Sequence, residues 1–199
     1  QHLDAELDVV GLAINNIAIT GSALNVVCDT PTANTKVTTG SEGATTAAAT
    51  QINNSARHEI AAAGGIIDVQ YEFTLGANGV PASMIMNAHL VHTGAAVTMD
   101  LYAWNYTGTP AFEIVHANIL PSSVSTSDVD VTANLLARHT SGGKVILRFY
   151  KTGLGTTSLN IDQLIVSYSE ALSALITKIP ASDSNVTWNA TALASINAE

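Results

Sequence analysis

The chain has 199 residues, of which 47% are apolar and 12% are charged, which is enough for one full-sized β domain with extensions or for two small units. Seven basic residues against sixteen acidic ones give a formal charge of −9, and the basic residues are scattered, so the composition argues against binding to nucleic acid or to anionic lipid. The single cysteine, Cys28, excludes an internal disulfide and a cysteine-based metal site within one chain.

Residues 1–36 are predicted to form an N-terminal β segment or arm. Two apolar stretches, Leu7–Ile19 and Ala23–Val27, are separated by a turn-forming Gly-Ser pair, which favours short strands. Cys28 follows two valines, so we expect a buried and unreactive thiol. No apolar run in the chain approaches the roughly 18 to 20 residues that a membrane-spanning helix needs.

Residues 37–56 are low in complexity. Thr, Ala, Gly and Asn dominate this stretch, so it offers almost nothing large to bury. The composition predicts a linker that is either extended or a strand that borrows its partner from elsewhere.

Residues 57–168 carry the strongest pattern, in which apolar and polar residues alternate in short runs divided by Gly, Pro, Ser and Asn. Alternation with period two places every second side chain on the same face of a strand. The clearest run sets Val97, Met99, Leu101 and Ala103 on one face against Thr98, Asp100, Tyr102 and Trp104 on the other.

Two further runs alternate in the same way. In one, Val129, Val131, Ala133 and Leu135 oppose Asp128, Asp130, Thr132 and Asn134, and in the other Leu159, Ile161 and Ile165 oppose Asn160 and Asp162. The remaining predicted strands are Ile66–Leu75, Ser83–Val91, Ala111–Ile119 and Lys144–Tyr150. No helix long enough for a parallel crossover lies between them. The prediction is therefore a mainly β, antiparallel two-sheet sandwich of the jelly-roll type.

Residues 169–199 are predicted to form a helical or irregular C-terminal tail. Apolar residues recur at helical spacing after Ser169, which can cap the first turn, and Pro180 ends the run. The spacing predicts a short helix over 169–180. Because thirty residues cannot form a core of their own, the tail is expected to pack on the sandwich or on a neighbouring subunit.

The sequence contains none of the common catalytic, phosphate-binding or metal-binding motifs, so no catalytic, cofactor-binding or metal-ligating residue is predicted. His89 and His92 form the closest histidine pair, but residues three apart in a strand point to opposite faces. Asp128, Asp130 and Asp162 could supply oxygens to Ca²⁺. The solvated polar faces of strands explain these carboxylates better.

The best candidate for a binding surface is an aromatic group on one predicted strand. Tyr102, Trp104 and Tyr106 could form a platform on which a sugar ring stacks, with Asp100 and Asn105 as hydrogen-bonding neighbours. The alternative is an inter-sheet core or a subunit interface, where Trp and Tyr also concentrate. We favour the core or interface.

Three segments carry a family resemblance: ARHEIAAAGGIIDVQYEFTLG, VTMDLYAWNY and GGKVILRFYKTGLGTTSLNIDQLIVSYS. Together they resemble a domain of tailed-bacteriophage virion proteins, which is similar to the jelly-roll sandwiches of carbohydrate-binding modules. The resemblance implies a virion location as a fibre, tail or head-decoration protein, with other virion proteins as partners, and a homotrimer. It carries over no sugar-binding residues.

The functional hypothesis is a non-catalytic structural component of a bacteriophage virion that works by subunit assembly. The alternative is a glycan-binding adhesin or carbohydrate-binding module, whose ligand would be a host surface glycan. A hydrolase with an unrecognised site is a third, weaker hypothesis.

Overall fold

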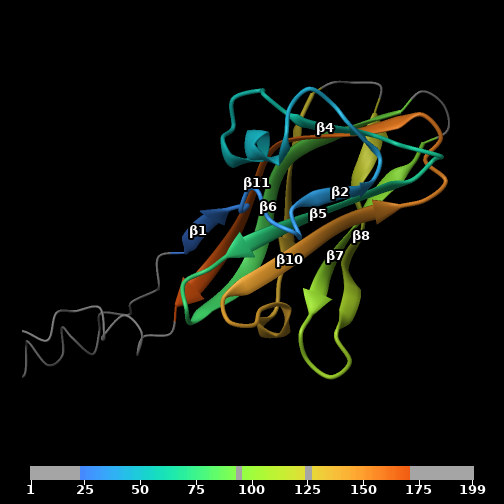
Figure 1. Ribbon diagram of the computed structural model, residues 1–199. Helices are drawn as coiled ribbons and strands as arrows, with labels where there is room; N and C mark the ends of the chain where they lie inside the picture. Colours follow the sequence, from blue (N-terminus) through green and yellow to red (C-terminus); the bar gives the residue numbers. More distant parts are fainter. Residues whose placement is uncertain (1–22, 93–95, 124–126, 171–199) are drawn as a thin grey trace, which may run out of the picture. The chain divides into compact units, whose positions relative to one another are not determined.

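The computed structural model describes residues 23–92, 96–123 and 127–170, in which two antiparallel sheets pack as a sandwich (Figure 1). The predicted mainly β sandwich is therefore confirmed. No helix in this part of the chain could cross a membrane. The elements are β1 (Leu24–Val27), β2 (Lys36–Thr39), β3 (Ser41–Glu42), the 3₁₀ helix η1 (Ala47–Gln51), β4 (His58–Ala61), β5 (Ile67–Thr74), β6 (Gly79–His92), β7 (Thr98–Asn105), β8 (Ala111–Ser123), β9 (Val129–Asn134), the 3₁₀ helix η2 (Ala137–His139), β10 (Lys144–Lys151) and β11 (Thr157–Glu170).

The two sheets contain six and five strands. Sheet A has the order β9-β6-β11-β4-β3, and β1 also pairs with β11, whereas sheet B has the order β2-β5-β10-β7-β8. Strand β8 belongs to both, since it pairs antiparallel with β7 up to Pro121 and its last residues, Ser122 and Ser123, pair in parallel with β6. Sheet B therefore ends at β8.

The core lies between the sheets and follows from the alternation of side chains. In β5, Ile67, Val69, Tyr71 and Phe73 are fully buried, and the residues between them point to the outer face of sheet B. The alternation predicted for β7 is also confirmed, because Met99, Leu101 and Ala103 are fully buried and the intervening aromatic residues are only partly buried.

Two predicted core positions are wrong. Ile161 and Ile165 do not share a face, because the alternation in β11 changes phase between them: Leu164 and Val166 are buried and Ile165 is half-buried. Val129 is predicted for the buried face, yet it is 45% exposed. It begins β9, which pairs with β6 only and so forms an edge of sheet A.

Residues 37–56 contain β3, η1 and most of β2, and their strands have borrowed partners: β2 pairs with β5 and β3 with β4. In η1, Thr50 and Ala47 are buried, so small side chains here pack closely.

The predicted C-terminal helix does not begin at Ser169, since Ser169 and Glu170 end β11. Its other residues, like the predicted strands of residues 1–22, lie outside the described residues.

Candidate functional site

The predicted aromatic strand is β7, which lies between β10 and β8 in sheet B. Tyr102 and Trp104 are half-buried on its outer side. Asp100 shares that side, but it is 9% exposed, and its carboxylate accepts a hydrogen bond from Lys151 Nζ at 2.7 Å. The rings thus face outward, whereas the carboxylate is already engaged.

The other two predicted site residues lie where β7 ends. Asn105 Nδ2 donates to Glu113 at 3.0 Å, and Asn105 Oδ1 accepts from the backbone N–H of Thr107 at 2.8 Å. The backbone N–H of Tyr106 donates to the Arg138 carbonyl at 2.9 Å, and burial raises the pKa of the Tyr106 hydroxyl. Asn105 is therefore used by its own chain to shape the turn.

Neighbouring strands add side chains that were not predicted as site residues. Phe112 and Ile114 of β8 lie directly across from Trp104 and Tyr102, and Arg148 of β10 lies across from Tyr102 on the other side. The sequence held one local indication of these additional side chains. Arg148 and Tyr150 lie two apart in the predicted strand Lys144–Tyr150, and residues two apart in a strand share a face. The aromatic face is defined as Tyr102, Trp104, Phe112, Ile114, Arg148 and Tyr150.

The rings of the aromatic face pack edge to face rather than side by side. Tyr102 and Tyr150 have centroids 6.0 Å apart and planes at 69°, and Trp104 and Phe112 have centroids 4.9 Å apart and planes at 80°. The Arg148 guanidinium lies 5.1 Å from the centroid of Phe112 and 4.5 Å from that of Tyr150. Arg148 therefore contacts two of the four rings through cation–π interactions.

Three cations on this side of sheet B, Lys144, Arg148 and Lys151, are paired with carboxylates of neighbouring strands. Arg148 makes two hydrogen bonds of 2.7 Å to Asp68, and the hydrogen bonds to Asp68 raise the pKa of Arg148 further. Lys144 Nζ lies 2.9 Å from Glu72. With the Lys151–Asp100 pair, these contacts compensate much of the charge around the aromatic face.

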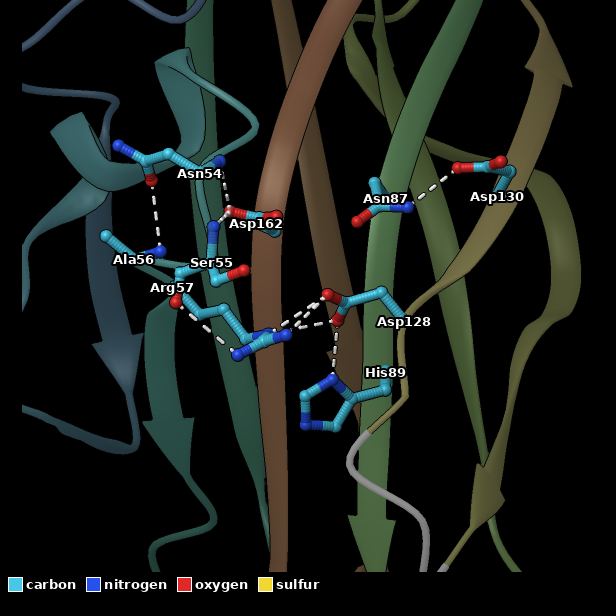
Figure 2. A network of polar contacts seen from close by, with 9 residues as sticks. All are labelled: Asn54, Ser55, Ala56, Arg57, Asn87, His89, Asp128, Asp130 and Asp162. Atoms are coloured by element: carbon cyan, nitrogen blue, oxygen red, sulfur yellow. Dashed lines mark hydrogen bonds and ion pairs between the residues drawn. The ribbon is translucent and has the colours of Figure 1, made fainter.

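The outer side of sheet A carries a different network, which Figure 2 shows. Arg57 donates three hydrogen bonds of 2.7 to 3.1 Å to Asp128, whose Oδ1 also lies 2.6 Å from His89 Nδ1. Partial burial raises the pKa of Asp128, but the hydrogen bonds from Arg57 and His89 outweigh it, so this pKa lies below its ordinary value. The network ties β6 to the residues that directly precede β4 and β9.

The other carboxylates considered for Ca²⁺ have separate partners. Asp162, 2% exposed, accepts hydrogen bonds from the backbone N–H groups of Asn54 and Ser55, and Asp130 accepts one from Asn87. Within the described residues no group of three metal-ligating side chains converges. The carboxylates instead hold strands and a loop in place (Figure 2).

A polar contact also crosses the core. His58 of β4 is 1% exposed, and its ring nitrogens lie 2.7 Å from the Tyr71 hydroxyl of β5 and 2.7 Å from Glu42 of β3. Burial lowers the pKa of His58 more than Glu42 raises it. His58 and Glu42 line a cavity of about 500 Å³ whose wall includes Thr46 and small apolar residues. His58 thus joins the two sheets, and its lowered pKa favours the neutral imidazole.

The remaining predicted details concern single residues. His89 and His92 do not form a pair, since His92 Nδ1 lies 2.8 Å from Thr157 Oγ1 and His89 binds Asp128. Cys28 is 1% exposed, as expected, and burial raises the pKa of its thiol. The thiol lies 3.1 Å from Thr50 Oγ1, so it is held within the fold.

No protein-family model matches the chain, and no curated protein is similar to it.

Proposed function

We propose that this protein is a non-catalytic structural component of a bacteriophage virion, a fibre, tail or head-decoration protein that acts through subunit assembly. The observation that carries the proposal is the aromatic face, an outward patch of rings and an exposed isoleucine on one sheet of the sandwich. Aromatic residues and arginine are the side chains enriched in protein interfaces. The proposal includes a jelly-roll-like sandwich, homotrimeric assembly and contacts with other virion proteins.

The arrangement of the rings supports assembly over sugar binding. A sugar stacks on a ring whose flat side is open to solvent. Here the guanidinium of Arg148 lies over Phe112 and Tyr150, and each remaining ring packs against a neighbour. Such a surface is pre-organised for protein contact, because its side chains lose little freedom on binding.

The test of the virion proposal is the gene's neighbourhood together with the particle. We expect portal and major capsid genes beside this gene, and the full chain in purified particles by mass spectrometry. A gene that stands among carbohydrate-degrading enzymes, with the chain missing from particles of a phage that encodes it, would reject the proposal.

The second candidate is a glycan-binding adhesin, which the partial exposure of Tyr102 and Trp104 favours. A glycan array with the full chain separates the two candidates. The adhesin predicts a clear glycan hit that Trp104→Ala abolishes with an unchanged melting temperature. The structural proposal predicts no such hit, and Trp104→Ala then weakens packing or assembly.

A further inference from the structure

Residues 41–56, here called the strap, contain β3, η1 and the loop that leads to β4. The strap covers Cys28, whose thiol lies 3.1 Å from Thr50 Oγ1 and 3.6 Å from the Ala47 carbonyl. Ala47 and Thr50 are its only buried residues, and its one large apolar side chain, Ile52, is 63% exposed. A segment with so few buried contacts opens at a lower free energy than the core. Polar anchors therefore decide whether the strap stays closed.

His58 anchors the strap from inside the sandwich. Its Nε2 lies 2.7 Å from Glu42 Oε1, and its Nδ1 lies 2.7 Å from the Tyr71 hydroxyl. An ionised carboxylate can only accept a hydrogen bond, so Nε2 carries the proton and donates to Glu42. Nδ1 is then the acceptor, and the Tyr71 hydroxyl donates to it. The neutral imidazole thus satisfies both partners at once.

A second proton on His58 disrupts this arrangement. Nδ1 becomes a donor, so the Tyr71 hydroxyl can no longer donate to it. Tyr71 is fully buried, and among the described residues the only hydrogen bond of its hydroxyl is the one to His58. Protonation therefore places a charge in the core and leaves a buried donor without an acceptor, and both effects cost free energy.

The surroundings of His58 do not compensate the added charge. The other titratable and charged groups around it are Cys28, Lys36, Glu42, Glu59, Tyr71 and Asp162. Glu42 attracts the imidazolium, but its side chain is 42% exposed and water screens the attraction. Lys36 lines the same cavity as His58 and repels a second cation. Burial accordingly lowers the pKa of His58 more than Glu42 raises it.

The remaining groups leave this balance unchanged. Glu59 is exposed, and it follows His58 on the opposite face of β4. Asp162 lies on the outer side of sheet A, where it accepts from the backbone N–H groups of Asn54 and Ser55 and so anchors the other end of the strap (Figure 2). Burial raises the pKa of the Cys28 thiol, which therefore stays neutral in acid.

We propose that a proton on His58 opens the strap, so that acid uncovers Cys28 while the rest of the sandwich stays folded. In the open form His58 titrates at its ordinary pKa of 6.5, whereas in the closed form its pKa is lower. The closed form is therefore most stable above pH 6.5 and loses stability as the pH falls below it. The cavity that His58 and Glu42 line gives the proton a path to the ring.

Thiol labelling tests the opening, because Cys28 is the only cysteine of the chain. Dithiodipyridine reacts with thiols in acid as well as at neutral pH, and the full chain is labelled at about pH 7 and about pH 5. His58→Gln is the matched control, since an amide donates and accepts but does not titrate. Relative to this variant, the labelling rate should rise up to about 25-fold over the interval, as one proton and a pKa of 6.5 require. An equal pH dependence in the two chains would overturn the proposal.

A second variant distinguishes His58 from the anchor at the other end of the strap. Asp162→Asn keeps a side-chain oxygen that accepts from Asn54 and Ser55 but removes the titration of this carboxyl. It should retain the pH dependence of the unchanged chain. A pH dependence that disappears in Asp162→Asn and persists in His58→Gln would assign the opening to Asp162 and reject the role of His58.

Hydrogen exchange of the unchanged chain separates strap opening from global unfolding, and it needs no variant that folds. After correction for the intrinsic exchange rate, protection of residues 41–56 should fall between about pH 7 and about pH 5, while protection of β10 stays constant. A parallel loss in both segments would mean that Cys28 is uncovered by unfolding of the whole sandwich, which contradicts a local opening.

Discussion

The outer sides of the two sheets differ in how far the chain itself covers them. On sheet A, Asp162 and His89 are 2% and 5% exposed. Backbone N–H groups of a loop bind Asp162, and Asp128, which directly precedes β9, binds His89. On sheet B, the aromatic rings remain half-exposed and Ile114 is 55% exposed. The middle of sheet A is thus closed by polar contacts, although Val80 and Val129 of its strands are 39% and 45% exposed, whereas on sheet B the exposed isoleucine lies beside a group of aromatic rings.

The largest expected loss of stability is at Arg148, which makes both an ion pair and cation–π contacts on sheet B. Arg148→Ala removes two hydrogen bonds to Asp68, whose side chain is 8% exposed, and two cation–π contacts. We expect a loss of about 2–4 kcal/mol in the free energy of unfolding, measured by urea titration at neutral pH. Arg138→Ala is the control, since its side chain is 44% exposed and should cost at most about 1 kcal/mol.

Equal losses in the two arginine variants would contradict this account of sheet B. The aromatic face would then be held by its rings alone, and Arg148 would contribute no more than an exposed ion pair.

The next effect probes sheet A. Asp128→Ala leaves Arg57 and the nearly buried His89 without their shared acceptor, so we expect a loss of about 1–3 kcal/mol. Asp130→Ala is the matched control, because Asp130 is exposed and, among the described residues, accepts a hydrogen bond from Asn87 only, and the loss should stay within about 0.5 kcal/mol. Thermal unfolding of both variants gives the comparison, and a larger loss for Asp130→Ala would show that the network does not tie the strands.

How far these surfaces could be predicted depends on how far apart in the sequence the interacting residues lie. The inward and outward sides of β7 were predictable, because alternation is a local property of the chain. The meeting of Trp104 with Phe112 and Arg148 was not, since it depends on the order β10-β7-β8 in the sheet. The contact of His58 with Tyr71 was missed for the same reason, as its two residues come from different sheets.

Other misses were local but left no signal in the residue types. In β11 the alternation of buried and exposed side chains shifts by one residue before Leu164. The residue types around this position fit either alternation, so the sequence does not indicate the shift. The short strands β2 and β3 consist of small and polar residues, so they carry no apolar alternation. Their existence depends on the partners β5 and β4.

A smaller effect is expected at Trp104. The ring is half-buried and packs on Phe112, so Trp104→Ala should cost about 1–2 kcal/mol, less than the roughly 3–5 kcal/mol of a fully buried ring. Trp104→Phe keeps an aromatic contact and should cost less. Urea titration of both variants, with sedimentation velocity for assembly, measures the effect. An unchanged free energy in Trp104→Ala would mean that the ring does not stabilise sheet B.

The smallest expected effect is a pH dependence at Glu113, which belongs to neither outer side. The hydrogen bond from His139, followed by those from Arg138 and Asn105, lowers the pKa of Glu113 from 4.5 to about 2. A carboxylate with a lowered pKa in the folded state stabilises the fold above its unfolded pKa. This contribution is lost as the pH falls from 4.5 towards about 2, and Glu113→Gln should flatten the fall of stability over that window. The Glu113 carboxyl signal in an NMR titration should still report the ionised form at about pH 3, because this pH lies above the lowered pKa. A midpoint near 4.5 would show that His139 does not hold the carboxylate in solution.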